Sequence, residues 1–498
     1  MSRKIRRLLI ANRGEIVGRI VATARVMGIE TVTIHATDDK DLPHASIGDF
    51  ACELEGGTLA ETYLNIDQII AIAKRADADA IHPGYGFLSE NAGFAKAVAK
   101  AGLTFVGPPS DIIASMGDKA ASRKLCEEIG VPVVPGYHGK AQDTAALTRA
   151  AKKIGFPLLV KAAAGGGGKG MRIVESEKQL AAALESARAE AQSAFGNGRL
   201  LLEKYLLQPR HIEVQVFSDA QGHHLHLFER ECSIQRRHQK IVEESPSMNL
   251  PDAKRKKMFE AALKITSHIG YVGAGTVEFI LDNRGEFYFL EMNTRLQVEH
   301  PVTEMVTGLD LVRLQLEVAQ GLPLTLKQSD IKQLGHAVEV RLYAEDPARD
   351  FLPAPGDLAV FDLPHLPGLR CENGYRGGVK VSGRYDPMLA KIVAFGNTRD
   401  DAIALCLQAL SRSLVIGVTS NRAFLMRVLD SKPFRDGKTS TDFIAKYKDS
   451  LLSTALSDPD IARLAAAHLL FNSKAATTSG TIEAEHSAWT HGALAGWR

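Results

Sequence analysis

Cysteine is scarce in this chain of 498 residues, which has five cysteines and no Cys-x-x-Cys pair. Such isolated cysteines exclude a zinc knuckle and a disulfide scaffold, and they are typical of a reducing cytosol. Neither sign of charge dominates, because 60 Lys+Arg against 58 Asp+Glu leave a net charge of +2. This balance excludes nucleic-acid binding that depends mainly on charge. The apolar run Leu8–Ala11, which breaks at Asn12, is too short for a signal peptide or a membrane span. We therefore expect a cytoplasmic protein without a membrane segment.

The composition is that of a folded protein, with 45% hydrophobic and 24% charged residues. At roughly 150 residues per domain, the length predicts about three domains. Strands alternate with helices over the first 115 residues, beginning with the strand RRLLIAN, a helix from Glu15 to about Met27 and the strand ETVTIHA. This alternation predicts a parallel sheet. Further along we expect a small α/β unit at 136–204, a strand-rich part at 210–330, short strands and then helices at 335–445, and finally one amphipathic helix with a small-polar linker.

A glycine run, Gly165–Gly168 followed by Lys169 and Gly170, satisfies G-x-G-x-x-G. It is not a dinucleotide fingerprint, because a strand and not a helix follows it, and it lacks the ending of a Walker A loop. A glycine loop between two strands is typical of a flap over ATP phosphates; a plain surface hairpin is the alternative. Lys161 favours the flap, since an ammonium at the end of an apolar strand calls for an anion nearby. Lys119 alone is a weaker candidate.

The segment HIEVQVF alternates cleanly between two faces. Ile212, Val214 and Val216 form an apolar face, and His211 begins a polar face that would line a site. The alternative is an edge strand whose polar face meets water.

A hairpin is predicted from Thr276–Leu281 and Glu286–Met292, joined by the turn residues DNRG. With a two- or four-residue loop, Glu278 would lie opposite Phe289. Glu278 and Glu291 would then be diagonal neighbours on one face, roughly 7–8 Å apart. Two carboxylates so close call for a cation between them, and Mg²⁺ takes carboxylate and phosphate oxygens together. Asn293, on the same face, is a further oxygen donor. A loop of odd parity would instead turn the two glutamates to opposite faces.

The segment after this hairpin, MNTRLQVEH, is unusually polar for an exit turn. It holds Arg295, Gln297, Glu299 and His300 within six residues. Separately, HAVEVRLYAED places Arg341 in an alternating strand with Glu339, where a cross-strand salt bridge is the plain interpretation.

Several long motifs resemble the biotin carboxylase component of biotin-dependent carboxylases, a family within the ATP-grasp superfamily. They are IANRGEI, HPGYGFLSEN, VKAAAGGGGKGMRIV, EKYLLQPRHIEVQVF, ERECSIQRRHQKIVEE, EMNTRLQVEHPVTE and HAVEVRLYAED. The resemblance runs from about residue 4 to residue 447. YDPMLAKI and the final AWTHGALAGWR look most like the α-subunits of acyl-CoA carboxylases, such as the methylcrotonoyl-CoA and propionyl-CoA enzymes.

The resemblance implies an α/β and α+β fold in three parts followed by a tail. These are an N-terminal parallel-sheet (pre-ATP-grasp) domain at 1–117, an ATP-grasp domain at 118–333 with a mobile lid at about 131–205, and a C-terminal biotin carboxylase domain at 334–447. Residues 448–498 would be a helix and linker that start an incomplete partner-binding segment. The implied reaction converts ATP, bicarbonate and carrier-bound biotin to ADP, phosphate and carboxybiotin through carboxyphosphate.

The resemblance also implies a role for individual residues. ATP would contact Lys119, Lys161, Gly165, Gly166, Gly167, Gly168, the adenine hinge residues Glu203, Lys204 and Leu206, and His211, Gln235 and His238. The metal ligands would be Glu278, Glu291 and Asn293, which agrees with the separate argument from the hairpin. The bicarbonate pocket would hold Lys240, Arg295, Gln297 and Val298. Glu299 would be the general base, beside the cation of Arg295, and Arg341 would face biotin.

The implied cofactors are ATP and Mg²⁺ or Mn²⁺, with biotin as a substrate on a carrier and not attached to this chain. The implied partners are a biotin carboxyl carrier domain, a carboxyltransferase subunit and a second copy in a homodimer; no nucleic acid or membrane is expected. Full-length α-subunits continue to an Ala-Met-Lys-Met biotinylation motif that this sequence lacks, so a truncated chain and a short subunit both fit. The main alternative is another ATP-grasp ligase that forms an acyl-phosphate. A non-catalytic subunit is disfavoured because every expected site residue is present.

Overall fold

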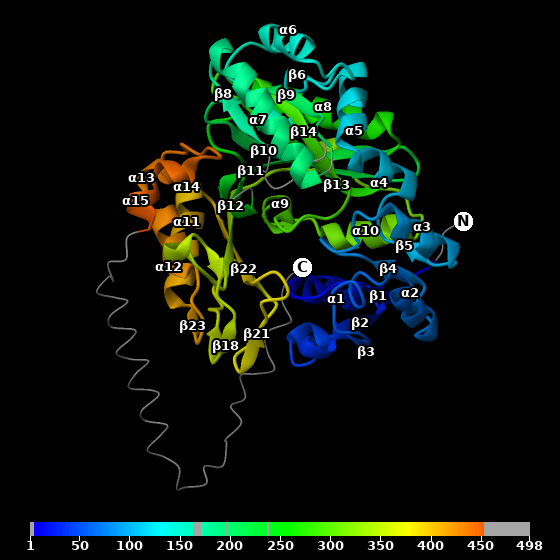
Figure 1. The fold of residues 1–498 in the computed structure, drawn as a ribbon. Coiled ribbons are helices and arrows are strands. Elements are labelled where there is room, and N and C mark those ends of the chain that lie inside the picture. Colours follow the sequence, from blue (N-terminus) through cyan, green and yellow to red (C-terminus); the bar gives the residue numbers. More distant parts are fainter. Residues whose placement is uncertain (1–3, 163–170, 196, 237–238, 453–498) are drawn as a thin grey trace, which may run out of the picture. The chain divides into compact units, whose positions relative to one another are not determined.

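The computed structural model describes residues 4–162, 171–195, 197–236 and 239–452. The segment Met1–Leu451 is one compact unit (Figure 1). The glycine run at 165–168, His238 and the predicted helix and linker after residue 452 lie outside the described residues.

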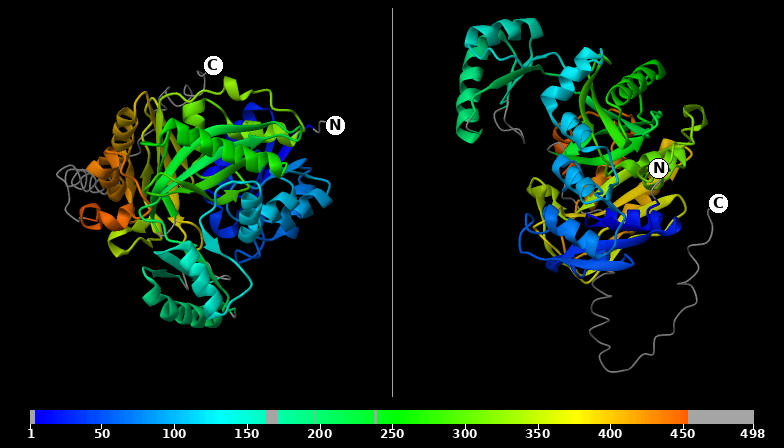
Figure 2. Two further views of the ribbon diagram at one scale, coloured as in Figure 1. Left: turned by 90° about the horizontal axis from the view of Figure 1, so that it is seen from above. Right: turned by 90° about the vertical axis from the view of Figure 1, so that its right-hand side faces the viewer.

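The N-terminal part contains the expected parallel sheet, in the order β3-β2-β1-β4-β5. In the right-hand view of Figure 2 these blue elements gather in a layer of their own. Helix α1 packs its residues Ile16, Ile20 and Ala24 into the core at helical spacing. The elements are β1 Arg7–Ile10, α1 Glu15–Val26, β2 Glu30–Ala36, β3 Phe50–Leu54, α2 Ile66–Arg75, β4 Ala80–His82, α3 Ala92–Lys100, β5 Thr104–Phe105, α4 Ser110–Gly117 and α5 Lys119–Glu128.

The predicted small α/β unit is a four-stranded antiparallel sheet in the order β6-β9-β7-β8. Helices α6 and α7 contact this sheet and each other (Figure 1). Leu158, Val160 and Leu202 form its apolar core with Leu147 of α6 and Leu184 of α7. The elements are β6 Gly136–Tyr137, α6 Thr144–Ile154, β7 Leu158–Ala162, β8 Arg172–Val174, α7 Glu177–Phe195 and β9 Leu200–Lys204.

A large antiparallel sheet has eight strands, in the order β14-β13-β10-β11-β12-β15-β22-β20. Several of the predicted site residues lie on these strands. The sheet crosses the expected domain boundary between residues 333 and 334, because β12, which precedes this boundary, pairs with β15, which follows it. Helix α8 packs on one face through Met258, Ala262 and Ile265, whereas α9 packs near β11, β12 and β15. The elements are β10 Arg210–Ser218, β11 His224–Arg236, β12 Gln239–Ser245, α8 Asp252–His268, β13 Gly273–Leu281, β14 Phe287–Asn293, α9 His300–Thr307, β15 His336–Tyr343, β20 Leu369–Asn373 and β22 Met388–Gly396.

Short strands and then helices complete the unit, as the sequence predicts. The strands are β16 Glu345–Asp346, β17 Leu352–Pro353, β18 Gly356–Leu358, β19 Val360–Asp362, β21 Val379–Val381 and β23 Leu414–Ile416. The helices are α10 Leu311–Ala319, α11 Arg399–Arg412, α12 Arg422–Asp430, α13 Lys432–Arg435, α14 Phe443–Lys446 and α15 Lys448–Leu451, with 3-10 turns at Thr37–Asp39, Pro43–Ala45, Gln328–Asp330 and Pro347–Arg349. Among the described residues, no helix has both the length and the apolar character needed to span a membrane.

Candidate active site

Polar side chains gather on the face of the large sheet opposite α8. Along β10, Ile212, Val214 and Val216 belong to the apolar core beneath α8, so the alternate residues point to the other face. That face carries His211 and Glu213, both buried. The alternative of a solvated edge strand is wrong, because β11 and β13 flank β10.

The predicted hairpin forms, but its predicted register is wrong. Strands β13 and β14 are joined by residues 282–286, an odd number where an even number was expected. Phe279 therefore pairs with Phe289, the residue that was expected opposite Glu278. A regular ladder with this loop would turn Glu278 and Glu291 to opposite faces of the sheet.

A β-bulge restores the shared face of the two glutamates. The register shifts between the pairs Glu278–Glu291 and Phe279–Phe289, which leaves Leu290 as the extra residue of β14. Glu278 consequently lies directly opposite Glu291, and not diagonally as predicted. The shared face was correctly predicted, although for the wrong geometric reason.

Lys240 of β12 lies among three carboxylates. Its Nζ donates to Glu213 Oε2 at 2.5 Å, Glu278 Oε1 at 2.8 Å and Glu299 Oε1 at 2.6 Å. Burial lowers the pKa of Lys240, but the three carboxylates raise it more, so that it lies well above its ordinary value. The ammonium is therefore charged and neutralises part of a strongly acidic cluster.

Glu299 lies between two cations at the start of α9. One oxygen accepts from Lys240, and Arg341 Nη2 donates to the other, Oε2, at 2.9 Å. Burial raises the pKa of Glu299, but Lys240 and Arg341 more than offset this effect, so the pKa lies below its ordinary value. The carboxyl is ionised at neutral pH and is positioned to accept a proton.

Arg341 of β15 makes a second ion pair on the same face, with Glu243 of β12 at 2.6 Å. Burial raises the pKa of Glu243 to about 7 despite this arginine. Glu339, opposite Glu243 in the ladder, also has its pKa raised, mainly by burial. The plain interpretation of Arg341 as a partner in a cross-strand salt bridge is thus confirmed by its contact with Glu243, and the structure adds a contact with Glu299.

Arg295 does not accompany Glu299 as the sequence argument expected. Its Nε donates to Glu90 Oε2 at 3.0 Å, and its Nη2 donates to Asn293 Oδ1 at 3.0 Å. The cations that contact Glu299 are instead Lys240 and Arg341. Glu299 lies after the end of β14 and directly before α9, so its distance from Arg295 along the chain does not reveal which cations it contacts.

Two other predicted pocket residues have defined partners. Gln297 Nε2 donates to Glu278 Oε1 at 2.8 Å, while its Oε1 accepts from Arg230 Nη2 at 2.8 Å. The carbonyl oxygen of Val298 accepts from Lys391 Nζ at 2.9 Å.

The predicted metal ligands converge at the bulged hairpin. Asn293 Nδ2 donates to Glu278 Oε1 at 2.7 Å, and Glu291 Oε2 lies 3.0 Å from Lys119 Nζ. Glu278 thus pairs with the ammonium group of Lys240, and Glu291 pairs with that of Lys119. The two carboxylates therefore attract positive charge to this end of the hairpin. The donor set of two carboxylates and an amide oxygen suits Mg²⁺ or Mn²⁺. His211, Glu213 and Glu278 also offer ligand atoms within 4.8 Å of one another, but Lys240 contacts two of these three residues.

The described ATP-binding candidates come from several elements. Lys161 of β7 and Arg123 of α5 both pair with Glu203 of β9, and Lys204 Nζ donates to the carbonyl of Phe156 at 2.8 Å. Burial raises the pKa of Glu203, but the two cations, Lys161 first, lower it more.

Two further candidates lie on neighbouring strands, and a third follows β9. Gln235 Nε2 lies 2.7 Å from His211 Nδ1; His211 Nε2 in turn lies 2.8 Å from Glu278 Oε2. Leu206, which follows β9, is half-buried.

A cavity of about 370 Å³ opens beside Arg341 and includes residues without a predicted role. Its lining contains Arg295, Arg341 and Val298 together with Tyr85, Gly86, Gln239, Tyr343, Asp386 and Met388. Tyr85 and Gly86 belong to HPGYGFLSEN, and Asp386 and Met388 to YDPMLAKI, two motifs that indicated the family but were given no task. A larger cavity of about 690 Å³ is lined by Arg19, Glu304 and Arg370 among others, and none of the predicted site residues line it. The smaller cavity, which Arg295, Arg341 and Val298 line, is therefore the candidate binding site.

Three family models match consecutive parts of the chain. They are "Biotin carboxylase, N-terminal domain" at residues 4–113, "Carbamoyl-phosphate synthase L chain, ATP binding domain" at 118–327 and "Biotin carboxylase C-terminal domain" at 339–446.

Two curated proteins show the range of similar sequences. The mitochondrial methylcrotonoyl-CoA carboxylase subunit alpha of Dictyostelium discoideum is 47% identical, over 99% of this chain and 70% of that protein. Biotin carboxylase 2 of Bacillus subtilis is 48% identical, over 89% of this chain and 99% of that protein. The chain spans 63% of the corresponding mouse methylcrotonoyl-CoA carboxylase subunit.

Solved structures agree with this result. The biotin carboxylase domain of Hydrogenobacter thermophilus 2-oxoglutarate carboxylase, in complex with MgADP, ADP and bicarbonate, has a TM-score of 0.85 and 41% identity over 91% of this chain and all of that one. A biotin carboxylase of Campylobacter jejuni, solved as a β,γ-ATP complex, has a TM-score of 0.83 and 43% identity over 89% of this chain and 99% of that one.

Proposed function

This chain belongs to the biotin carboxylase family, and from that premise we propose how its residues carry out the reaction. The protein is an ATP-dependent ligase that carboxylates biotin with bicarbonate, using ATP, a divalent metal and biotin as substrate. The products are ADP, phosphate and carboxybiotin. Within a whole carboxylase, this reaction would be the first half of the carboxylation of an acyl-CoA.

One observation carries the assignment of roles: Glu299 lies between Lys240 and Arg341 in a buried site. In our proposal Glu299 is the general base that removes the proton of bicarbonate. Bicarbonate would be held by Lys240, Arg295, Gln297 and the backbone of Val298. A bicarbonate ion bound here would also interact with Lys240, so that Lys240 stabilises the charge of Glu299 less. The pKa of Glu299 would then rise, which favours removal of the bicarbonate proton.

Deprotonated bicarbonate would attack the γ-phosphate of ATP to give carboxyphosphate. The carboxylates of Glu278 and Glu291 and the amide oxygen of Asn293 would hold the metal, which supplies positive charge to phosphate oxygens when bound. Lys119 and Lys161, with the glycine run 165–168, would contact the phosphates. Lys119 pairs with Glu291, and Lys161 pairs with Glu203. These ion pairs would hold both lysines near the phosphate-binding site before ATP binds.

The remaining predicted contacts would hold the base of ATP and the biotin. Glu203, Lys204 and Leu206 would form the adenine hinge, and His211, Gln235 and His238 would line the nucleotide site. Carboxyphosphate would break down to CO₂ and phosphate, and this phosphate would take the ureido proton of biotin. Arg341 would stabilise the enolate that forms until its nitrogen attacks the CO₂, since a guanidinium keeps its charge at any working pH. The cavity beside Arg341 has a volume of about 370 Å³, on the scale of a small-molecule site.

We also propose the domain boundaries 1–117, 118–333 with a lid at 131–205, 334–447 and 448–498. The family works with a carboxyl carrier and a carboxyltransferase, often as a dimer. For this chain we propose a biotinylated carrier domain, a carboxyltransferase subunit and a homodimer. A cytoplasmic location is proposed from the five cysteines, all free thiols. A biotinylated carrier should raise kcat/KM well above the value for free biotin, because a docked carrier supplies a high effective concentration.

A bicarbonate-dependent ATPase assay with and without free biotin tests the proposal. We expect ATP cleavage to require bicarbonate and to accelerate with biotin. Cleavage that is independent of biotin but forms an acyl-phosphate with another carboxylate would favour a different ATP-grasp ligase.

A further inference from the structure

Arg230 of β11 is a charged residue at the centre of the polar cluster, with a side-chain exposure of 0%. A guanidinium has five N–H groups, and each of them has an acceptor here. Nε donates to Glu213 Oε1 (2.5 Å), Nη1 to Gln215 Oε1 (2.7 Å) and Thr303 Oγ1 (2.9 Å), and Nη2 to Gln297 Oε1 (2.8 Å) and Thr276 Oγ1 (3.1 Å).

Two of these contacts lead to proposed bicarbonate ligands. Glu213 accepts from Arg230 with one oxygen and from Lys240 Nζ with the other, at 2.5 Å. Gln297 presents its carbonyl oxygen to Arg230 and its amide nitrogen to Glu278. Because a guanidinium only donates, the amide of Gln297 cannot rotate by 180° without placing two donors against each other.

We propose that Arg230 is a positioning residue for bicarbonate: it sets Lys240 through Glu213 and fixes the amide orientation of Gln297. The inference rests on the proposed assignment of Lys240 and Gln297 to the bicarbonate pocket. All five N–H groups of Arg230 are engaged by protein, so the residue acts through its neighbours and not on the substrate.

The geometry requires arginine and not merely a positive charge. A planar fork can contact acceptors on two strands, on the segment between β14 and α9, and on α9 at once, whereas an ammonium has three donors on a flexible stem. In Arg230→Lys, Glu213 would keep a charged partner, but Gln297 or the threonines would lose theirs. The amide of Gln297 would then be free to flip, and Lys240 would be held less firmly.

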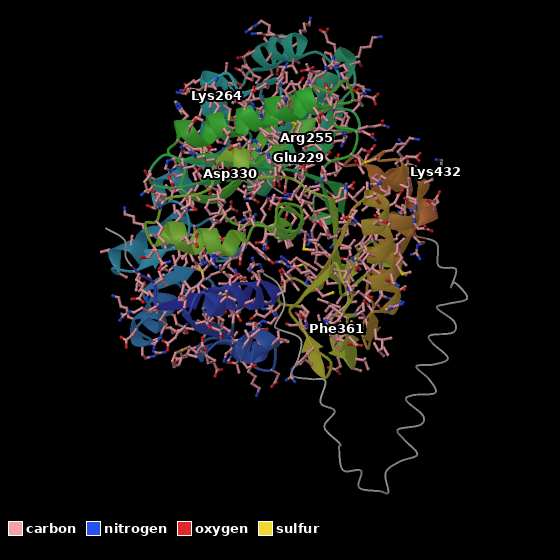
Figure 3. The ribbon with its side chains drawn as sticks, turned by 180° about the vertical axis from the view of Figure 1, so that it is seen from behind. Glu229, Arg255, Lys264, Asp330, Phe361 and Lys432 are labelled. Carbon is pink, nitrogen blue, oxygen red and sulfur yellow. The ribbon has the colours of Figure 1, made fainter. Side chains whose placement is uncertain are left out.

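The experiment is steady-state kinetics of ATP cleavage with Arg230→Lys. We expect the KM for bicarbonate to rise about tenfold or more, while the KM for ATP stays within about twofold. The matched control is Arg255→Lys. Arg255 reaches from α8 to the buried Glu229, the residue before Arg230, on the other face of β11 (Figure 3). That variant should lower the melting temperature without raising the KM for bicarbonate.

A second variant keeps Arg230 itself and removes one of its acceptors. Thr303→Val is nearly isosteric, and its control on the same helix is Thr307→Val. In the hydrogen bonds described, the Thr307 hydroxyl contacts only backbone groups, those of Thr303 and Leu309. We expect the KM for bicarbonate to rise about two- to fivefold in Thr303→Val alone. An enzyme whose bicarbonate KM is unchanged in both Arg230→Lys and Thr303→Val would overturn the inference. An unaltered enzyme that cleaves ATP without bicarbonate would instead overturn the proposed pocket, and the inference with it.

Discussion

Arg341 donates from Nη2 to Oε2 of Glu299 at 2.9 Å, so the residue proposed to face biotin and the proposed general base form one ion pair. The pair is buried and joins β15 to the start of α9. In our proposal this one contact therefore takes part in both half-reactions of the enzyme, the cleavage of ATP and the carboxylation of biotin.

Substitutions at this ion pair should separate the half-reactions. In Arg341→Ala, Glu299 retains Lys240, so bicarbonate-dependent ATP cleavage should stay within about tenfold of the unaltered rate. Carboxylation of biotin should fall by about a hundredfold or more, because the cation for the enolate is lost. Glu299→Gln should suppress both reactions. Equal losses of both activities in Arg341→Ala would assign this arginine to the fold and not to biotin.

The metal requirement should depend on the hairpin carboxylates. Because Glu278 and Glu291 are proposed metal ligands, Glu278→Gln and Glu291→Gln would each remove a negative charge that helps to hold the cation, so each should raise the Mg²⁺ concentration for half-maximal ATP cleavage about tenfold or more. Titration of Mg²⁺ at fixed ATP measures this. Glu286→Gln, in the turn of the same hairpin, is the control and should leave the requirement unchanged; unchanged dependence in both test variants would contradict the assignment.

Leu290 should be dispensable, both as a side chain and as the extra residue of the bulge. Leu290 is 45% exposed, so Leu290→Ser should retain Mg²⁺-dependent ATP cleavage within about twofold. Deletion of Leu290 removes the bulge and leaves Glu291 directly after Phe289, which pairs with Phe279, so a regular ladder still places Glu291 opposite Glu278. Mg²⁺-dependent ATP cleavage should then stay within about tenfold of the unaltered rate. A deletion variant that is folded by circular dichroism but has lost Mg²⁺-dependent cleavage would contradict this pairing.

Glu15, at the start of α1, should make stability depend on pH. Burial raises its pKa to about 7 from an ordinary 4.5, against the opposing charge of Lys391. Between pH 4.5 and 7 the unfolded chain releases this proton while the folded chain keeps it, so stability falls as the pH rises. The loss amounts to about 3 kcal/mol by pH 7.5.

Urea unfolding of Glu15→Gln beside the unaltered protein measures this effect. The variant has no proton to release, so its stability relative to the unaltered protein should increase from pH 4.5 to pH 7.5. Glu260→Gln, at an exposed position of α8, should show no such trend. A constant difference between Glu15→Gln and the unaltered protein across this range would contradict the prediction.

Local patterns in the chain were sufficient to predict much of the fold. The alternation of strands and helices before residue 115 predicted the parallel sheet that the structure contains, and the period of two in HIEVQVF predicted which residues of β10 enter the core. These predictions succeed because side-chain period and turn chemistry are properties of neighbouring residues. The pairing of β12 with β15 was not predictable, since nothing local specifies a partner about a hundred residues away.

The sequence by itself determined which chemical groups this protein has: paired glutamates on a hairpin, lysines at strand ends, and the motifs that identify a biotin carboxylase. Only the tertiary structure decided which of them meet. It placed Lys240 and Arg341, not Arg295, against Glu299, and it brought Arg230 into contact with Glu213 and Gln297. A single bulge residue turned Glu291 toward Glu278. The physical reason is that contacts across a sheet depend on strand order, register and one-residue irregularities, and these are set by the packing of the whole chain.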